Sequence, residues 1–515
     1  MPPRNRGLTQ ASFSSVFSSS PYSMATRLGI PIWPLLVTAL LASVTTYWWL
    51  RKCRPTSSGA IPVVGFRSPL EPTFFVRVRY IWDAPSMIAE GYAKFKGSMF
   101  KIPRFNGDVV VVSPKYLDEL QHMPEERLLG SGVVLNAGGP PSEVAVALEN
   151  SIGSRALQTM PQEEEGWVEM EIQPLFLQLI FHMSQRFLVG PRLCRDQEWL
   201  AAMGEFADNL VRLQLVAAIV PSILRPILFM VHPWAWKHSA AVRRGRAIMQ
   251  SEIQSRTHGG VEDDEAHRAK ADDVLQGMIK LSSPEDVRNR PGVLGHRLMA
   301  TSGVAGHSTA ASAVQAFVDL VAKPDLAEEL RAEVSTVLSN EGGIWKGSSV
   351  SKLMKLDSFL RESQGHTPAI LLTCHRIVRD PAGITLHDGA HLACGTHLCL
   401  ASHSISRDPA NVRGPDAFDG LRYYRQRHES GADTMKHQHA TADRNHLHFG
   451  YGRNSCPGRF VASCELKLLF AALLRGYEFA YPLGVAAPPR RKHVLEFPYL
   501  DPATSMMVRR RPQMT

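Results

Sequence analysis

The most informative stretch of the chain is residues 448–460, which has the sequence HFGYGRNSCPGRF. Its glycine-containing loop ends in Cys456, and Pro457 is typical of the first position of a helix, here predicted to continue through Leu474. A sulfur at a helix N-terminus meets unpaired N–H groups and the positive end of the dipole, which favour the thiolate that ligates metals. An inert buried cysteine is the alternative.

The same stretch resembles the haem-binding motif of the cytochrome P450 family, F-x-x-G-x-basic-x-C-x-G, matched by Phe449, Gly452, Cys456 and Gly458. The resemblance implies haem b (iron protoporphyrin IX) as the cofactor, with the Cys456 thiolate as the axial ligand of the iron. Phe449 would shield the sulfur, and the glycines would let the backbone approach the flat cofactor closely.

A second motif lies in the predicted helix Val293–Ala322, where residues 305–309 have the sequence AGHST. It resembles the family's oxygen-activating segment, A-G-x-acid-T, and implies that Thr309 holds a water or the distal oxygen with its hydroxyl. Ser308 stands at the acid position, so proton delivery would run through water and a second hydroxyl. A close helix–helix contact is the alternative explanation of such small residues.

A third resemblance joins two segments. Residues 415–422 match the family's P-x-x-F-x-x-x-R, and by resemblance Arg422 locks this segment to Glu362. The family's E-x-x-R requires an arginine three residues after Glu362, where this chain has Gly365. His366, four residues after Glu362, lies on the same helix face and, if protonated, could partly replace the guanidinium. The alternative places His366 at the start of the loop before Pro368.

Two rival functions follow from departures in the sequence. Gly365, together with Asn454 at the position of the family's usual propionate-binding Arg or His, suggests a haem-deficient, membrane-anchored pseudoenzyme or scaffold; Arg453 is one position out of register. Four histidines precede the cysteine loop with H-x-H spacing and suggest, less strongly, a zinc-binding module: His437, His439, His446 and His448.

Composition bounds the remaining choices. The chain has 515 residues, 44% hydrophobic and 20% charged, which excludes disorder, collagen and a polytopic transporter. Its seven cysteines are scattered without a CxxC pair, so neither a disulfide framework nor a four-cysteine zinc site is expected. The net charge of +9 is dispersed and lacks a nucleic-acid motif, so no nucleic-acid partner is predicted.

The N-terminus predicts membrane attachment. After a tail (1–27), Leu28–Leu50 is free of charge and about 34 Å long as a helix, which spans a hydrocarbon core. Aromatic and basic residues follow it, which favours a single uncleaved anchor over a signal peptide. Residues 51–62 are a linker rich in helix breakers, and 63–515 form the catalytic domain. A second apolar stretch, Leu213–Trp236, is interrupted by prolines and fits the bilayer interface or a buried helix pair equally well.

The remaining pattern predicts a mainly α fold with a small β portion, the cytochrome P450 fold by resemblance. Residues Phe100–Ile102 and Val109–Val112 form a predicted hairpin, and Thr257–Asp272 an exposed loop. The other helical runs are Trp167–Leu188, Gln197–Val216, Ala240–Arg256, Asp325–Ser339, Lys352–Gln364 and Arg459–Leu474.

The resemblance implies a monooxygenase that inserts one atom of dioxygen into a C–H bond and reduces the other to water. Electrons would come from a separate NADPH-dependent cytochrome P450 reductase, since the chain has no flavin or G-x-G-x-x-G motif. Trp167–Arg195 and Ser402–Tyr424 look similar to fungal members that oxidise terpenoids, meroterpenoids and indole diterpenes, so an apolar small molecule is the expected substrate. The family's usual topology places the catalytic domain in the cytosol, at the endoplasmic reticulum.

Overall fold

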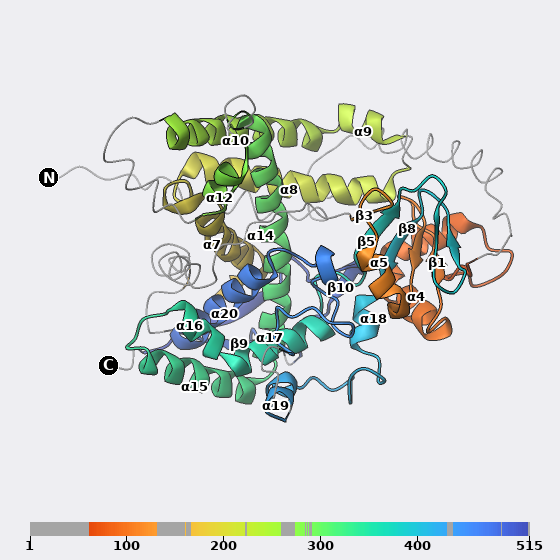
Figure 1. Cartoon of the computed structure of the whole chain (residues 1–515). Coiled ribbons are helices and arrows are strands. Elements are labelled where there is room, and N and C mark those ends of the chain that lie inside the picture. The colour runs from red at the N-terminus through yellow and green to blue at the C-terminus, as the bar shows by residue number, and fades with distance from the viewer. Residues whose placement is uncertain are drawn as a thin grey trace.

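The computed structural model describes residues 61–130, 160, 166–221, 224–258, 273–283, 285, 287, 291–429, 436–485 and 487–512. Helices make up most of this part of the chain (Figure 1). They are α4 (Thr73–Lys94), η1 (Pro114–Tyr116), α5 (Leu117–His122), α7 (Ile172–Leu193), α8 (Gln197–Ile219), α9 (Arg225–Val231), α10 (Pro233–His258), α12 (Val274–Leu281), α14 (Pro291–Val321), α15 (Pro324–Asn340), α16 (Gly347–Lys352), α17 (Met354–His366), α18 (Ser402–Ser406), α19 (Arg422–Glu429), η4 (Gly452–Asn454) and α20 (Arg459–Gly476).

The strands are short and mostly antiparallel. They are β1 (Phe100–Ile102), β2 (Val109–Val111), β3 (Leu128–Gly130), β4 (Val168–Glu171), β5 (Thr373–Val378), β6 (Ile384–Thr385), β7 (His391–Leu392), β8 (His397–Leu400), β9 (Tyr477–Ala480), β10 (Lys492–Val494), β11 (Phe497–Tyr499) and β12 (Ser505–Arg510). The largest sheet has the order β1-β2-β8-β5-β3, in which only the β2–β8 pair is parallel. A second sheet has the order β4-β12-β9, and β6–β7 and β10–β11 form separate pairs.

The predicted helices and the hairpin β1–β2 are confirmed, with two corrections. The run predicted as a helix from Trp167 begins instead with β4, whose residues pair with β12 near the C-terminus, and α7 starts only at Ile172. The run predicted over Lys352–Gln364 is divided at Leu353 between α16 and α17. Most of the predicted loop Thr257–Asp272 lies outside the described residues.

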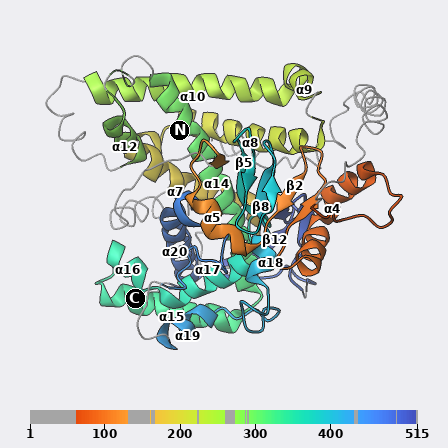
Figure 2. The ribbon, with the colours of Figure 1, turned by 45° about the vertical axis from the view of Figure 1, so that its right-hand side comes forward.

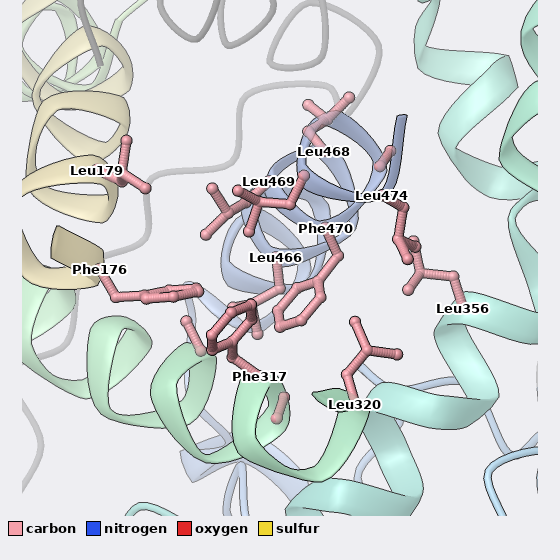
Figure 3. Packing of buried hydrophobic residues seen from close by; sticks show 14 of the residues in the cluster. Phe176, Leu179, Phe317, Leu320, Leu356, Leu466, Leu468, Leu469, Phe470 and Leu474 are labelled. Carbon is pink, nitrogen blue, oxygen red and sulfur yellow. The ribbon is translucent and has the colours of Figure 1, made fainter. Parts of the chain in front are cut away.

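Helix α14 runs through the middle of the molecule, from the layer of α8 and α10 to the layer of α15 and α17; the β-rich part lies to one side (Figures 1 and 2). A large buried cluster packs α14 against α7, α17 and α20. The rings of Phe176 and Phe317 lie 4.8 Å apart in this cluster, and Phe470 of α20 packs against Phe176 (Figure 3). Because α20 is fixed in this core, the loop at its N-terminus has a fixed position too.

The predicted anchor Leu28–Leu50 and most of the linker 51–62 lie outside the described residues. No helix in the described part is both long and apolar enough to cross a bilayer. The stretch Leu213–Trp236 forms the end of α8, then α9 and the start of α10. Helix α9 has no buried residue, and Met230 is 73% exposed. The alternative of an ordinary buried helix pair is therefore wrong for α9.

Candidate functional site

The cysteine loop places the Cys456 sulfur at the start of α20, as the sequence predicts. Desolvation by the surrounding protein raises the pKa of the Cys456 thiol, and the nearby backbone N–H groups of Gly458 and Arg459 offset part of this rise. The backbone N–H of Cys456 donates to the Phe449 carbonyl at 2.6 Å, which closes the loop. The thiol is free, and the residue is accessible to solvent. The expectation that Pro457 is the first helical residue is wrong: Pro457 lies in the turn before α20, which begins at Arg459.

Two glycines of this loop adopt backbone conformations that side chains disfavour. Gly450 has φ +78°, and a Cβ there would lie 3.1 Å from the Asn454 carbonyl oxygen. Gly452 has φ +59°, and a Cβ there would collide with the side chain of Gln121. The loop thus lies close against α5, and both positions favour glycine because a side chain is strained at a positive φ.

The two hydroxyls predicted to act on oxygen lie on α14 in different environments. Ser308 is exposed, and its hydroxyl donates to the Val304 carbonyl at 2.9 Å. Thr309 is 6% exposed. Within the described residues no hydrogen bond joins either hydroxyl to the cysteine loop. Gly306 lies against α7, since a Cβ there would come 3.2 Å from the Phe181 ring. The small residues therefore serve a close helix contact, the alternative that the sequence left open, as well as any role in catalysis.

The expected ion pair between Glu362 and Arg422 is present and buried. Arg422 Nε donates to Glu362 Oε2 at 3.0 Å and Nη2 donates to Oε1 at 3.2 Å. The Asp419 backbone N–H also donates to Glu362 Oε1, at 2.9 Å. Three N–H donors, one from Asp419 just before α19 and two from Arg422 at its start, thus converge on one carboxylate of α17. This carboxylate fixes the segment that leads toward the cysteine loop.

His366 is the last residue of α17, and its Nε2 lies 3.2 Å from Glu362 Oε1. The expectation that His366 reaches Glu362 is confirmed, and the alternative that it begins the next loop is wrong. Burial raises the pKa of Glu362, but hydrogen bonds from His366 and Arg422 bring it below its usual value. Arg361 points elsewhere: its Nη1 donates to the carbonyls of Gln438 and Thr441.

The four histidines before the cysteine do not form a zinc site. No group of three or more His, Cys, Asp or Glu side chains suited to a metal occurs among the described residues, which include all four. His446 Nε2 contacts Gln364 Oε1 at 2.9 Å, and His448 Nε2 contacts the Ser406 hydroxyl at 3.2 Å. Burial lowers the pKa of His439 and that of His448 to about 3, so both are neutral packing groups. The zinc-binding module is therefore wrong.

One residue beside the loop was missed by the sequence reasoning. Arg376 of β5 is 9% exposed and lines a crevice with Gln121 and Tyr451, near the cysteine loop. The one hydrogen bond of its side chain among the described residues is a long one, 3.5 Å, to the adjacent His375 carbonyl. Burial and the nearby Arg453 lower its pKa, and no ion pair joins it to a carboxylate in the described part of the chain. The signal in the sequence was an arginine inside a strand segment of sequence TCHRIV, since a charged side chain there is buried only when it has a partner.

These features fit a flat anionic cofactor held through sulfur. The loop offers an exposed free cysteine with two backbone N–H groups near its sulfur, and Arg376 offers a buried cation that lacks a carboxylate partner among the described residues. Haem carries an iron that binds thiolate and two propionates that bind cations. Fold and site together therefore define a mainly helical haem-thiolate protein.

Comparisons with known proteins agree with this assignment. The family model for cytochrome P450 matches residues 144–500, and the chain belongs to the cytochrome P450 family. It is 48% identical over 509 residues to the cytochrome P450 monooxygenase terK of Tolypocladium album, covering 94% of this chain and 95% of that protein. It is 37% identical over 506 residues to the cytochrome P450 monooxygenase ltmK of Epichloe festucae (strain Fl1), covering 93% and 94%.

An ent-kaurene oxidase of Fusarium fujikuroi is 31% identical over 519 residues, covering 94% of this chain and 95% of that protein. Among solved structures, the haem domain of cytochrome P450DA matches with a TM-score of 0.63 at 16% identity, covering 88% of this chain and 97% of that one, which shows the shared fold. The chain is thus a cytochrome P450 monooxygenase with a haem-thiolate cofactor, whose electrons come from a reductase.

Proposed function

We propose that this cytochrome P450 oxidises an apolar terpenoid, meroterpenoid or indole diterpene in fungal secondary metabolism. The observation that carries the proposal is the near full-length similarity to fungal monooxygenases, one of them named for the oxidation of ent-kaurene. The exposed apolar side chains of α9 support an apolar substrate that enters from a membrane surface. The proposed electron donor is an NADPH-dependent cytochrome P450 reductase.

In this proposal Cys456 is the iron ligand, and Phe449, Gly452 and Gly458 shape the loop around it. Bound haem supplies the redox chemistry that activates dioxygen. Glu362 and Arg422 hold the preceding segment in place, and Arg376 binds a propionate in the role that Asn454 does not fill.

The test begins with the purified, reduced protein under carbon monoxide. An absorption band at about 450 nm reports thiolate-ligated haem. Incubation with reductase, NADPH and either ent-kaurene or an indole diterpene should then yield an oxygenated product. A protein that binds no haem would support the rival scaffold.

We predict that Thr309 positions the protons needed for productive oxygen chemistry. The change Thr309→Val is nearly isosteric at this buried position, so substrate binding should persist while product formed per NADPH consumed falls on the order of tenfold. Ser308→Ala is the matched control, because the Ser308 hydroxyl already donates to its own helix. Uncoupling by Ser308→Ala rather than by Thr309→Val would reverse the two roles.

We also propose a single-pass anchor at 28–50 after the tail 1–27, a linker at 51–62 and a catalytic domain at 63–515 in the cytosol, on the endoplasmic reticulum. Deleting residues 1–54 should release the protein only partly from membranes, because the exposed apolar residues of α9 would still bind the interface. Fractionation of cell membranes at low salt measures this. Complete release would show that α9 does not bind membranes.

A further inference from the structure

The position of the family's missing arginine is a gap in the packing. Gly365 is buried, yet a Cβ built there would meet no atom within 4 Å. The neighbouring Glu362 is 3% exposed, and Arg422 is its only guanidinium partner in the described structure. A buried carboxylate is stable only when several donors and opposite charge surround it, so the lost arginine requires a substitute.

A second guanidinium reaches this site from another element. Arg407 is the C-cap residue of α18, and its Nη1 lies 2.6 Å from His366 Nδ1. The opposite ring nitrogen of His366, Nε2, is the one that contacts Glu362 Oε1 at 3.2 Å. The imidazole thus lies between the Arg407 guanidinium and the Glu362 carboxylate. The other Arg407 contact is Nη2 to the fully exposed Asp416, at 2.8 Å.

The chemistry of the two partners fixes the protons of the ring. A guanidinium stays charged and can only donate, so His366 Nδ1 must accept and therefore carries no proton. Nε2 then carries the only ring proton and donates it to Glu362. A doubly protonated ring would place an N–H against the guanidinium at 2.6 Å. The expectation of a protonated His366 is therefore replaced by a neutral ring that connects two charges.

We propose that Arg407, acting through neutral His366, takes the place of the missing arginine and holds Glu362 in position. Arg407 is a positioning residue: it touches neither the cysteine loop nor any reacting atom among the described contacts. The benefit of this arrangement rests on the proposed role of Glu362 in holding the haem-binding segment. The contacts of Arg407 and His366 themselves depend only on an intact fold, not on the proposed function.

Three variants at one position separate a neutral bridge from a charged substitute. In His366→Gln the amide N–H can donate to Glu362 while the amide oxygen accepts from Arg407, so the unfolding midpoint should stay near that of the wild type. In His366→Lys the ammonium can pair with Glu362 but repels Arg407, so the midpoint should fall, as in His366→Ala. A lysine variant more stable than the glutamine variant would overturn the neutral bridge.

Arg407→Met tests the distant cation. Its unfolding midpoint should fall by about 2–4 °C, with a lower ratio of haem to protein, whereas the control Arg127→Met, which breaks a partly exposed pair with Asp380, should change neither. The fall in unfolding midpoint caused by Arg407→Met should shrink by half or more when His366→Ala is already present. It should shrink likewise when Gly365→Arg is present, because that change restores a guanidinium. Asp416→Asn should be neutral.

Equal effects of Arg407→Met and Arg127→Met, or an undiminished effect of Arg407→Met in the His366→Ala background, would refute the role of Arg407. Both readouts are independent of turnover. A wild-type protein that shows no band at about 450 nm would refute the proposed function, while the unfolding midpoints would still decide whether Arg407 supports Glu362.

Discussion

Cys456→Ala should abolish product formation and the carbon monoxide band at about 450 nm, because a methyl group offers no lone pair to iron. Cys456→Ser should do the same for product formation, since a hydroxyl is a far weaker donor than a thiolate. The structure supports this cysteine in particular: the residue is exposed and free, and the nearby backbone N–H groups of Gly458 and Arg459 lower the pKa of its thiol against the larger effect of desolvation. The measurements are the reduced difference spectrum and product per unit time.

The matched control is Cys464→Ala on the same helix. Cys464 is buried, and burial raises the pKa of its thiol to about 12, so it stays a neutral packing group. Its replacement should cost about 1 kcal/mol of stability or somewhat more and leave the spectrum unchanged. Product formation by Cys456→Ala at the wild-type rate would remove the haem-thiolate assignment altogether.

Local signals predicted the parts of the site that one segment builds alone. The cysteine loop, its glycines and α20 are indicated by turn residues and by a hydrophobic period of 3.6 residues. Both signals are contained in one stretch of about 30 consecutive residues. The pair between Glu362 and Arg422 joins segments 60 residues apart, and only the family resemblance predicted it. Its geometry then matched the expectation.

Long-range pairing produced some of the errors and omissions, and a local interruption of the helical pattern produced another. Val168–Glu171 continues a helical pattern but pairs with β12, more than 300 residues later, so tertiary strand pairing overrides the local helical preference. The long helix α4 was not predicted, since Pro85 and a kink at Asp83 interrupt its pattern. The contact of Arg407 with His366 spans 41 residues and no local period indicates it.

The second large effect is expected at Glu362. Glu362→Ala leaves the buried Arg422 without its charged partner and removes an acceptor from His366 and the Asp419 N–H. Breaking one side of a buried ion pair costs on the order of 3–5 kcal/mol, so the variant should bind little or no haem. The control Glu328→Ala removes an exposed partner of Arg331 and should cost less than about 1 kcal/mol.

A second test of the Glu362 carboxylate compares the unfolding free energies of the wild type and of Glu362→Gln as the pH is lowered. The folded-state pKa of Glu362 lies below its usual value, so its charge stabilises the fold fully above the unfolded pKa of about 4.3. That stability is lost as pH falls through the lower folded value. The difference in unfolding free energy between wild type and Glu362→Gln should therefore be constant above about pH 5 and shrink below it. A difference that stays constant down to pH 3 would mean that the charge of Glu362 does not hold this segment, and that the hydrogen bonds alone, which the amide partly keeps, carry the stabilisation.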